Sequence, residues 1–340
     1  MPAVAQQADP RRRAPEASGA APQTPGAAAK APVGYDEGRA QVSPSGDFVG
    51  GPGDFVGGPG DAKYDTPQQL ADPALARDDD TKQREAHSYK RKEGNLFHYG
   101  VRAQDVMQGW LSDCYFGAAL AAVAQRYPNT IKEGIEDRGG GVFGVRFYEV
   151  NSRGAAREEW VEVDADFPWF DKKENWAYMQ STQKKELWPS LVEKAYATFK
   201  AGGSGDYDTI GQGGWEGDVM EALTGRQSDY TEMANAPEDK LWQKLKKASD
   251  KGQAMTAGTY DDHGKEDARY GDATRMWGNH AYTVMGVKTK GRGRDKERMV
   301  QLRNPWGESE PGKDNKNDGV FWVTLEAFQR DFEALTILDN

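Results

Sequence analysis

Cysteine is almost absent from this chain, since Cys114 is the only one in 340 residues. A single cysteine excludes a disulfide within the chain, so nothing in the sequence requires an oxidising compartment. Histidine is also scarce, with four residues in all. There is no long apolar run, and Arg11, Arg12 and Arg13 are not followed by an apolar stretch. We therefore expect no membrane span and no Sec-type signal peptide, which leaves a cytoplasmic protein or one exported without that signal.

Excess positive charge is absent as well. The net charge is −10, which makes nucleic acid an unfavourable partner and is compatible with calcium or with basic peptides. The length suffices for one large domain or two of medium size.

Residues 1–85 contain few side chains that could fill a core and are rich in Ala, Pro, Gly and Gln, then in Asp and Arg. The unit GDFVGGP occurs at 46–52 and again at 53–59. Two copies of seven residues cannot stack into a solenoid, and their aspartate spacing differs from that of the calcium-binding nonapeptide repeat. We predict a disordered, low-complexity tail, which serves either as a flexible linker or as a segment for a delivery or docking partner.

The only cysteine stands at the start of a predicted helix. Residues 115–124 are small or apolar, and Ser112 and Asp113 occupy positions typical of helix N-caps. Cys114 would then lie in the first helical turn, where unpaired N–H groups favour a thiolate. Gln108, six residues upstream, carries an amide that could donate to an oxyanion. The alternative is a buried structural cysteine.

Further elements follow from hydrophobic periodicity and turn residues. A hairpin is predicted from 141–150 and 158–163, and a helix from 187–199. The Gly-rich stretch 207–217 contains Gly213 and Gly214, and it is either a hinge or a place where a substrate backbone comes close. Helices are predicted at 218–223 and 237–251. Strands are predicted at 253–257, 281–287, 299–303 and 320–325, and only a short pattern at 326–332 interrupts this strand-rich part.

Among the histidines, His280 is the best candidate for a base. His87 lies at the edge of the tail, His98 is too close to the predicted helix, and His263 lies in a loop of polar residues. His280 precedes an apolar strand, and Asn304 ends the next strand before a proline that cannot continue the ladder. Neighbouring antiparallel strands would bring this pair together, with Trp306 shielding it; a structural histidine is the alternative. The chain order Cys, His, Asn is the papain-type arrangement.

These segments resemble the protease core of the calpain family from about residue 98 to residue 338. The matching motifs are QG at 108–109 with LSDC at 111–114, LWPSLVEKAYA at 187–197, GNHAY at 278–282, RNPWGE at 303–308 and DGVFW at 318–322. The departures are Ser112, where the family usually has Gly, and Tyr115, where it usually has Trp.

The resemblance implies an α+β fold of papain-like two-lobe type. Residues 86–215 would form a helical lobe with Cys114, and residues 216–340 a β-rich lobe with His280 and Asn304. It further implies roles for the individual residues: Cys114 as the nucleophile, His280 as the base and then the acid, Asn304 as the residue that orients the imidazole, Gln108 as an oxyanion donor, Trp306 as a gating residue, and Gly213 and Gly214 as substrate-backbone contacts.

Calcium is the cofactor that the resemblance implies. An EF-hand at 314–326 is excluded because Lys316 replaces the third-position acid and Leu325 the twelfth-position Glu. The family's own first site would use Asp105 and Glu186 with the backbone carbonyls of His98 and Gly100. A second site would use Glu310 and Asp318, although Val320 stands where the family has an acid. The alternative is that these are surface acids with no ion.

Three functions remain open at this point. The first is a calcium-activated cysteine endopeptidase that cleaves protein substrates. The second is a transamidase or deamidase, which begins with the same thiol attack on an amide. The third is a binding module without activity, although such a module has no physical reason to keep Gln108, Cys114, His280 and Asn304 together.

Overall fold

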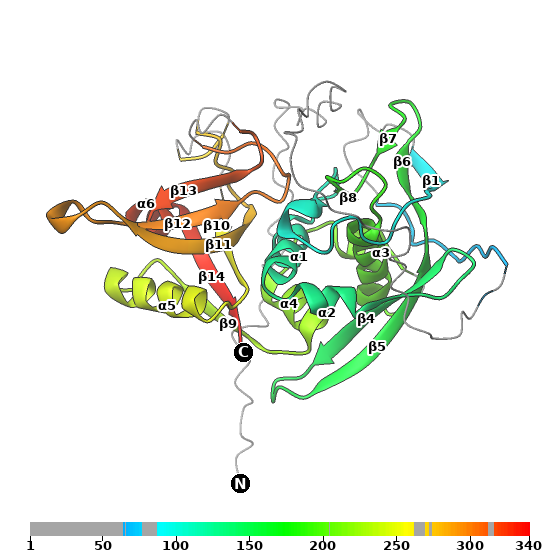
Figure 1. Cartoon of the computed structure of the whole chain (residues 1–340), viewed down its shortest axis with the longest axis horizontal. Coiled ribbons are helices and arrows are strands. Elements are labelled where there is room, and N and C mark those ends of the chain that lie inside the picture. The colour runs from blue at the N-terminus through cyan, green and yellow to red at the C-terminus, as the bar shows by residue number, and fades with distance from the viewer. Residues whose placement is uncertain are drawn as a thin grey trace, which may run out of the picture. The chain divides into compact units, whose positions relative to one another are not determined.

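The computed structural model describes residue 64 and residues 66–76, 87–203, 205–261, 269–271, 274–311 and 316–340 (Figure 1). The tandem GDFVGGP repeat and His263 lie outside the described residues. No helix among the described residues has the length and apolar character needed to cross a membrane.

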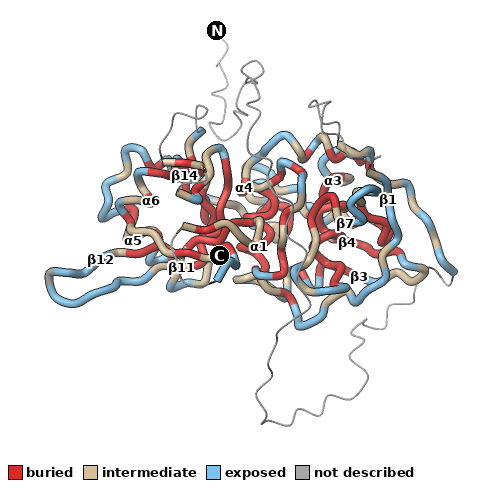
Figure 2. Tube along the Cα trace, turned by 90° about the horizontal axis from the view of Figure 1, so that it is seen from above, coloured by how far each residue is buried: buried red, intermediate tan, exposed pale blue. Residues whose placement is uncertain are grey.

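Helix α1 (Cys114–Arg126) is buried along almost its whole length, from Tyr115 to Ala124 (Figure 2). Its many alanines let neighbouring elements approach closely on all sides, which a surface helix with one apolar stripe could not do. It shares one hydrophobic cluster with α3 (Trp188–Ala201), α4 (Glu216–Thr224) and the hairpin of β4 (Val142–Val150) and β5 (Ala156–Asp164). The hairpin confirms the prediction made from the sequence, with Val142 opposite Asp164.

Short elements complete this part of the molecule. Strand β3 (Ile135–Asp137) extends the hairpin to three strands, and α2 (Pro128–Lys132) precedes it. A second three-stranded sheet has the order β1-β6-β7, formed by β1 (His87–Arg91), β6 (Asp166–Phe170) and β7 (Asn175–Trp176). The remaining pieces are η2 (Ala103–Asp105), β2 (Val106–Met107) paired with β8 (Gln180–Ser181), and η3 (Tyr207–Thr209).

A six-stranded antiparallel sheet forms the other part, in the order β13-β12-β11-β10-β14-β9. Its strands are β9 (Ser228–Glu232), β10 (Met255–Thr259), β11 (Ala281–Lys290), β12 (Glu297–Arg303), β13 (Val320–Thr324) and β14 (Phe332–Leu338). Helices α5 (Glu238–Asp250) and α6 (Leu325–Asp331) pack with it around a second hydrophobic cluster, and η4 (Gly293–Asp295) lies between β11 and β12. Four of these strands correspond to predicted ones, whereas β9 and β14 were not predicted.

Helix α1 also packs against this sheet, so it lies between β11 and α3 in both views (Figures 1 and 2). The Thr283 hydroxyl donates to the Ala118 carbonyl at 2.7 Å, and the Arg126 guanidinium donates to the Met285 carbonyl at 2.7 Å. Ala281 and Met285 of β11 belong to the same hydrophobic cluster as α1. The N-terminal end of α1, with Cys114, is therefore held close to the start of β11.

The structure differs from the expected domain boundaries at two places. Helix α4 was assigned to the part after residue 215, yet its Val219 and Met220 are buried in the cluster that contains α1. The described segment 66–76 was assigned to the tail, yet its Asp72 forms an ion pair with Lys194 at 2.5 Å. The Leu70 N–H also donates to the Asp164 carboxylate at 2.9 Å. The prediction of a free tail through residue 85 therefore does not hold for 66–76.

Candidate active site

Cys114 is the first residue of α1, with Asp113 at the N-cap as predicted. Its thiol lies against the backbone N–H of Ala281, the residue that follows His280. Burial raises the pKa of the Cys114 thiol to about 12, and the charges of Glu216 and Asp113 act in the same direction. The expected thiolate is thus not favoured in this conformation, because burial and nearby carboxylates outweigh the end of the helix.

His280 and Asn304 form the hydrogen-bonded pair that the strand order suggests, with 3.0 Å between the His280 Nε2 and the Asn304 Oδ1. The orientation of Asn304 follows from two backbone groups. Its Oδ1 accepts from the Trp306 N–H at 3.1 Å, and its Nδ2 donates to the Ser309 carbonyl at 3.1 Å. Since Oδ1 can only accept, the His280 Nε2 must carry a proton, and Nδ1 is left as the basic nitrogen.

The surroundings keep the imidazole neutral. Burial lowers the pKa of His280 to about 4, and the Asn304 hydrogen bond offsets only part of that shift. The Trp306 ring packs on the imidazole with 4.7 Å between centroids, and Trp277 lies 5.1 Å from Trp306. Trp306 thus packs against the His280 ring of the His280–Asn304 pair, and Trp277, which sequence reasoning did not single out, packs against Trp306.

Gln108 is buried beside the start of α1. Its side-chain amide donates to the Leu111 carbonyl at 2.7 Å, and its backbone N–H donates to the Pro305 carbonyl at 2.9 Å. The backbone contact joins the segment before Cys114 to the turn after Asn304. The amide is thereby held beside the residues that precede Cys114, although the hydrogen bond seen here is to the chain itself.

A carboxyl pair beneath the cysteine was missed by sequence reasoning. Asp113 and Glu193 are both fully buried and face each other. Burial raises the pKa of Asp113 to about 7, and burial followed by the Asp113 charge raises the pKa of Glu193 well above its usual range. One proton shared by the pair removes the repulsion. Glu193 also accepts the Met179 N–H at 3.0 Å. The available signal was a glutamate among the buried positions of the helix at 187–199.

The glycine-rich segment runs alongside the residues before Cys114. Ser112 and Gln212 form a parallel bridge, and the Gly213 N–H donates to the Ser112 carbonyl at 3.3 Å. Gly213 has φ +83° with open space where a side chain would be. A Cβ on Gly214 would come within 2.5 Å of the Tyr115 ring, so this position excludes other residues. Both glycines thus lie next to the cysteine segment, and the side-chain position at Gly213 faces open space.

Asp105 and Glu186, the acids of the first expected calcium site, are both buried. Glu186 accepts the His98 N–H at 2.7 Å and the Ser181 hydroxyl at 2.5 Å. Its pKa is raised by burial and, after that, by the Asp105 charge. Two buried carboxylates that repel each other are a fitting donor set for a hard cation. At present the Arg102 guanidinium supplies the positive charge, at 2.7 Å from the Asp105 carboxylate.

The second expected site is less complete. Glu310 is buried, whereas Asp318 is exposed and accepts the Val320 N–H at 3.1 Å within its own turn. Residues 312–315 between them lie outside the described residues. Across the described part of the chain, one group of three acids lies close enough to share an ion, namely Asp72, Asp164 and Asp166. Lys194 already supplies the cation there, at 2.7 Å from Asp164.

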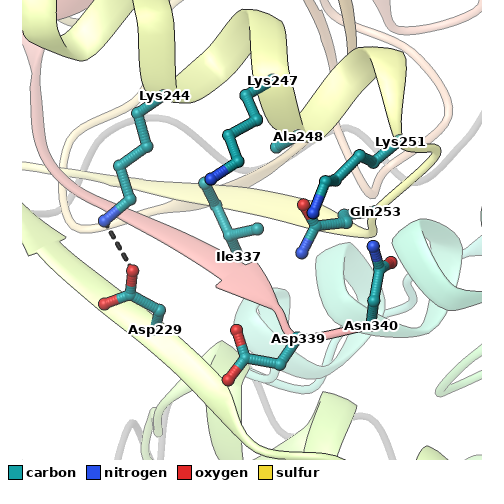
Figure 3. Close-up of a pocket in the computed structure, with 9 residues that line it drawn as sticks. All are labelled: Asp229, Lys244, Lys247, Ala248, Lys251, Gln253, Ile337, Asp339 and Asn340. Carbon is teal, nitrogen blue, oxygen red and sulfur yellow. Dashed lines mark ion pairs between the residues drawn. The ribbon is translucent and has the colours of Figure 1, made fainter.

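A separate hollow of about 430 Å³ lies beside α5 and contains none of the expected site residues (Figure 3). Lys244 and Lys247 reach over it from α5, and Lys251 reaches over it from the position just after that helix. Lys244 is paired with Asp229 at 2.7 Å. We assign it no part in the candidate active site.

Comparisons with known proteins relate the sequence of this chain to a protein family. The family model described as calpain family cysteine protease matches residues 76–313. The chain is 28% identical to human Calpain-8 over 264 residues, which covers 70% of this chain and 36% of the relative. It is 27% identical to the chicken Calpain-2 catalytic subunit over 266 residues (70% and 36%) and 27% identical to the rat Calpain-1 catalytic subunit over 270 residues (70% and 35%). The chain therefore matches about a third of the length of these relatives.

Proposed function

The chain belongs to the calpain family of cysteine proteases, and on that premise we propose that it is a calcium-activated endopeptidase with a Cys114–His280–Asn304 triad. The observation that carries the proposal is the fixed orientation of His280. Asn304 determines which imidazole nitrogen holds the proton, and the backbone N–H of Ala281, the residue after His280, contacts the cysteine thiol. A structural histidine would need no such arrangement beside the only cysteine.

The proposed chemistry is amide hydrolysis in two stages. The Cys114 Sγ attacks the peptide carbonyl carbon, its proton passes to the His280 Nδ1, and the imidazolium then protonates the leaving amine. An acyl-thioester remains on Cys114. A water molecule attacks it with His280 as the base, which releases the carboxylate product and restores the thiol. Gln108 would stabilise the oxyanion formed in each stage.

The neutral thiol and neutral imidazole support the idea that this conformation is a resting one. Papain-type catalysis needs a thiolate, and here both pKa shifts oppose the charged pair. A small rearrangement that hydrates Cys114 or moves a carboxylate away would reverse the balance. Displacements of about 1 Å suffice to change rates on the order of 100-fold.

Calcium held by Asp105 and Glu186, with the carbonyls of His98 and Gly100, would supply that rearrangement. When bound, the ion neutralises the two carboxylates and orders their segments. Asp105 is three residues before Gln108, so an ordered Asp105 bears directly on the proposed oxyanion donor. The buried Arg303, which precedes Asn304, donates to the Val106 carbonyl at 2.5 Å. A movement of residues 105–106 would therefore shift both the segment that carries Cys114 and the segment that carries Asn304.

The papain-like two-lobe fold is part of the same proposal. The two hydrophobic clusters, one around α1 and α3 and one under the six-stranded sheet, support it. The nucleophile would then come from one lobe and the base with its asparagine from the other. The second calcium site, at Glu310 and Asp318, stays a secondary part of the proposal because Asp318 is exposed.

Digestion in H₂¹⁸O tests the reaction class. We expect the wild-type protein with calcium to cut casein and to leave one ¹⁸O atom in each new C-terminal carboxylate, as seen by mass spectrometry. The Cys114→Ala protein should give no cuts. Incorporation of ¹⁸O into glutamine side chains without chain cleavage would instead indicate a deamidase and would overturn the endopeptidase assignment.

A further inference from the structure

Glu216 is a buried acid close to the candidate nucleophile, and the mechanism above does not use it. It is the first residue of α4, and only 7% of its surface is exposed. Within the described residues, no cation and no side-chain donor reaches its carboxylate. Burial raises the pKa of Glu216 to about 7, with only its own backbone N–H acting in the other direction. A largely buried carboxylate that is held only by its own backbone N–H and faces no cation is costly, so its persistence calls for an explanation.

The space in front of Glu216 is open. A Cβ built on Gly258 would lie 3.5 Å from the Glu216 Oε1 and, apart from Gly258 and its two chain neighbours, within 4 Å of no other described heavy atom. Gly258 itself is half-buried, and the pairing of β10 with β14 is irregular between Gly258 and Thr259. Irregular strands of this kind recur next to active sites, where they re-aim a side chain or end the strand pairing.

This open space lies within reach of the cysteine. Gly258 of β10 is paired with Ala281 of β11, and the Cys114 thiol lies against the Ala281 N–H. Paired residues on neighbouring strands are about 5 Å apart, so the Glu216 carboxylate lies on the order of 10 Å from the sulfur. An extended peptide advances about 3.3 Å per residue. A substrate side chain within about three residues of the attacked carbonyl can therefore reach Glu216.

The surroundings favour a positively charged group. Burial and then the charges of Glu333, Glu232 and Glu216 raise the pKa of Tyr230. Glu232 and Glu333 are exposed, and the Tyr230 and Trp215 rings meet edge to face with 5.6 Å between centroids. Carboxylates beside aromatic rings provide both ion pairing and cation–π contact.

We propose that Glu216 is a specificity-determining residue that binds the side chain of an arginine or lysine near the cleaved bond of the substrate. The inference rests on the proposed peptidase function and names the substrate class of that site. An arginine is the better ligand, because its guanidinium forms two parallel hydrogen bonds with a carboxylate. The incoming cation would pair with an acid that has only its own backbone N–H as a partner in the free protein.

The test is a fluorogenic peptide library in which each of the three positions before and after the cleaved bond is varied in turn. At each position, kcat/KM is measured for peptides with arginine, lysine, leucine or glutamine. For the wild-type protein with calcium, we expect a preference for arginine over glutamine of about tenfold to 100-fold at one position, as for a desolvated charge pair. Glu216→Gln should reduce this ratio to about one while cleavage of the leucine peptide continues.

Two controls separate recognition from folding. Asp218→Asn changes an exposed acid on the same helix, which lies 3.8 Å from Lys200, and should leave the arginine preference intact. Gly258→Val fills the open space and should lower the arginine preference without removing the carboxylate. If Glu216→Gln keeps the wild-type preference, or if the wild-type protein has none, the inference is wrong and the peptidase function stands. If the wild-type protein cleaves no peptide of the library or casein, both fall together.

Discussion

The protonation state of Cys114 allows a sharp prediction about its reactivity. Without calcium we expect iodoacetamide to alkylate Cys114 slowly, because the thiolate is the reactive form and burial holds the thiol pKa near 12. At pH 8 the thiolate fraction is then on the order of one in 10,000. Because the pKa is raised, the neutral thiol prevails at every pH below it, so the rate should rise about tenfold per pH unit from 7 to 10.

Saturating calcium should change this profile. If the ion brings His280 and Cys114 into an ion pair, alkylation at pH 7 becomes faster by about 100-fold or more and loses most of its dependence on pH. The assay is intact-mass spectrometry of the single-cysteine chain over time. His280→Ala is the matched control, since it removes the partner of the ion pair and should show no acceleration by calcium.

Rapid alkylation in excess chelator with a flat profile from pH 6 to 9 would refute the reasoning. Such a result would mean that the thiolate and the imidazolium are already paired in the resting protein. The neutral state inferred from burial would then be wrong, and calcium would have to act at another step.

Three further outcomes are expected. Asn304→Ala should lower kcat/KM by about tenfold to 100-fold, as for one hydrogen bond to a charged ring, whereas His280→Ala should lower kcat/KM on the order of 10,000-fold. Equal losses in steady-state assays would contradict the orienting role of Asn304. Asp164→Asn should lower the free energy of unfolding in urea by about 3 kcal/mol, because it removes a charged partner of the buried Lys194 ammonium. A decrease below about 1 kcal/mol would mean that Asp72 alone suffices to pair with Lys194. Glu186→Gln should raise the half-maximal calcium concentration about tenfold in a calcium titration of peptidase activity, and an unchanged midpoint would remove Glu186 from the site.

The local structure could be predicted from the sequence where a single hydrophobic pattern was clear. The unbroken apolar run after Cys114 predicted a buried helix, and α1 is buried over the same residues. The apolar strand after His280 and the proline after Asn304 predicted two neighbouring strands, and β11 and β12 are paired. In these places the local preference and the tertiary environment agree.

Other features depend on contacts between distant residues, which periodicity does not report. Strand β14 follows α6 without a turn residue between them, and its pairing with β9 joins segments about a hundred residues apart. The same holds for Lys194, whose buried ammonium meets Asp72 from a segment that composition assigns to the tail. Glu216 is similar, because its burial without a cation beside it follows from the packing of the folded chain.

The protonation state of the Cys114 thiol could not be predicted from the sequence either. The position of Cys114 at a helix N-terminus predicted a thiolate, which is correct for an isolated helix. Burial of the thiol and the neighbouring charges of Glu216 and Asp113 reverse the preference. Both effects depend on contacts between distant parts of the chain, so they could be compared only once the fold was known.

The most direct test of the central claim is digestion of casein by the wild-type and Cys114→Ala proteins, with calcium and with chelator, read as new peptide termini by mass spectrometry. We predict many new termini for the wild-type protein with calcium, few with chelator, and none for Cys114→Ala under either condition. New termini of equal yield from the Cys114→Ala protein would contradict the assignment of Cys114 as the nucleophile.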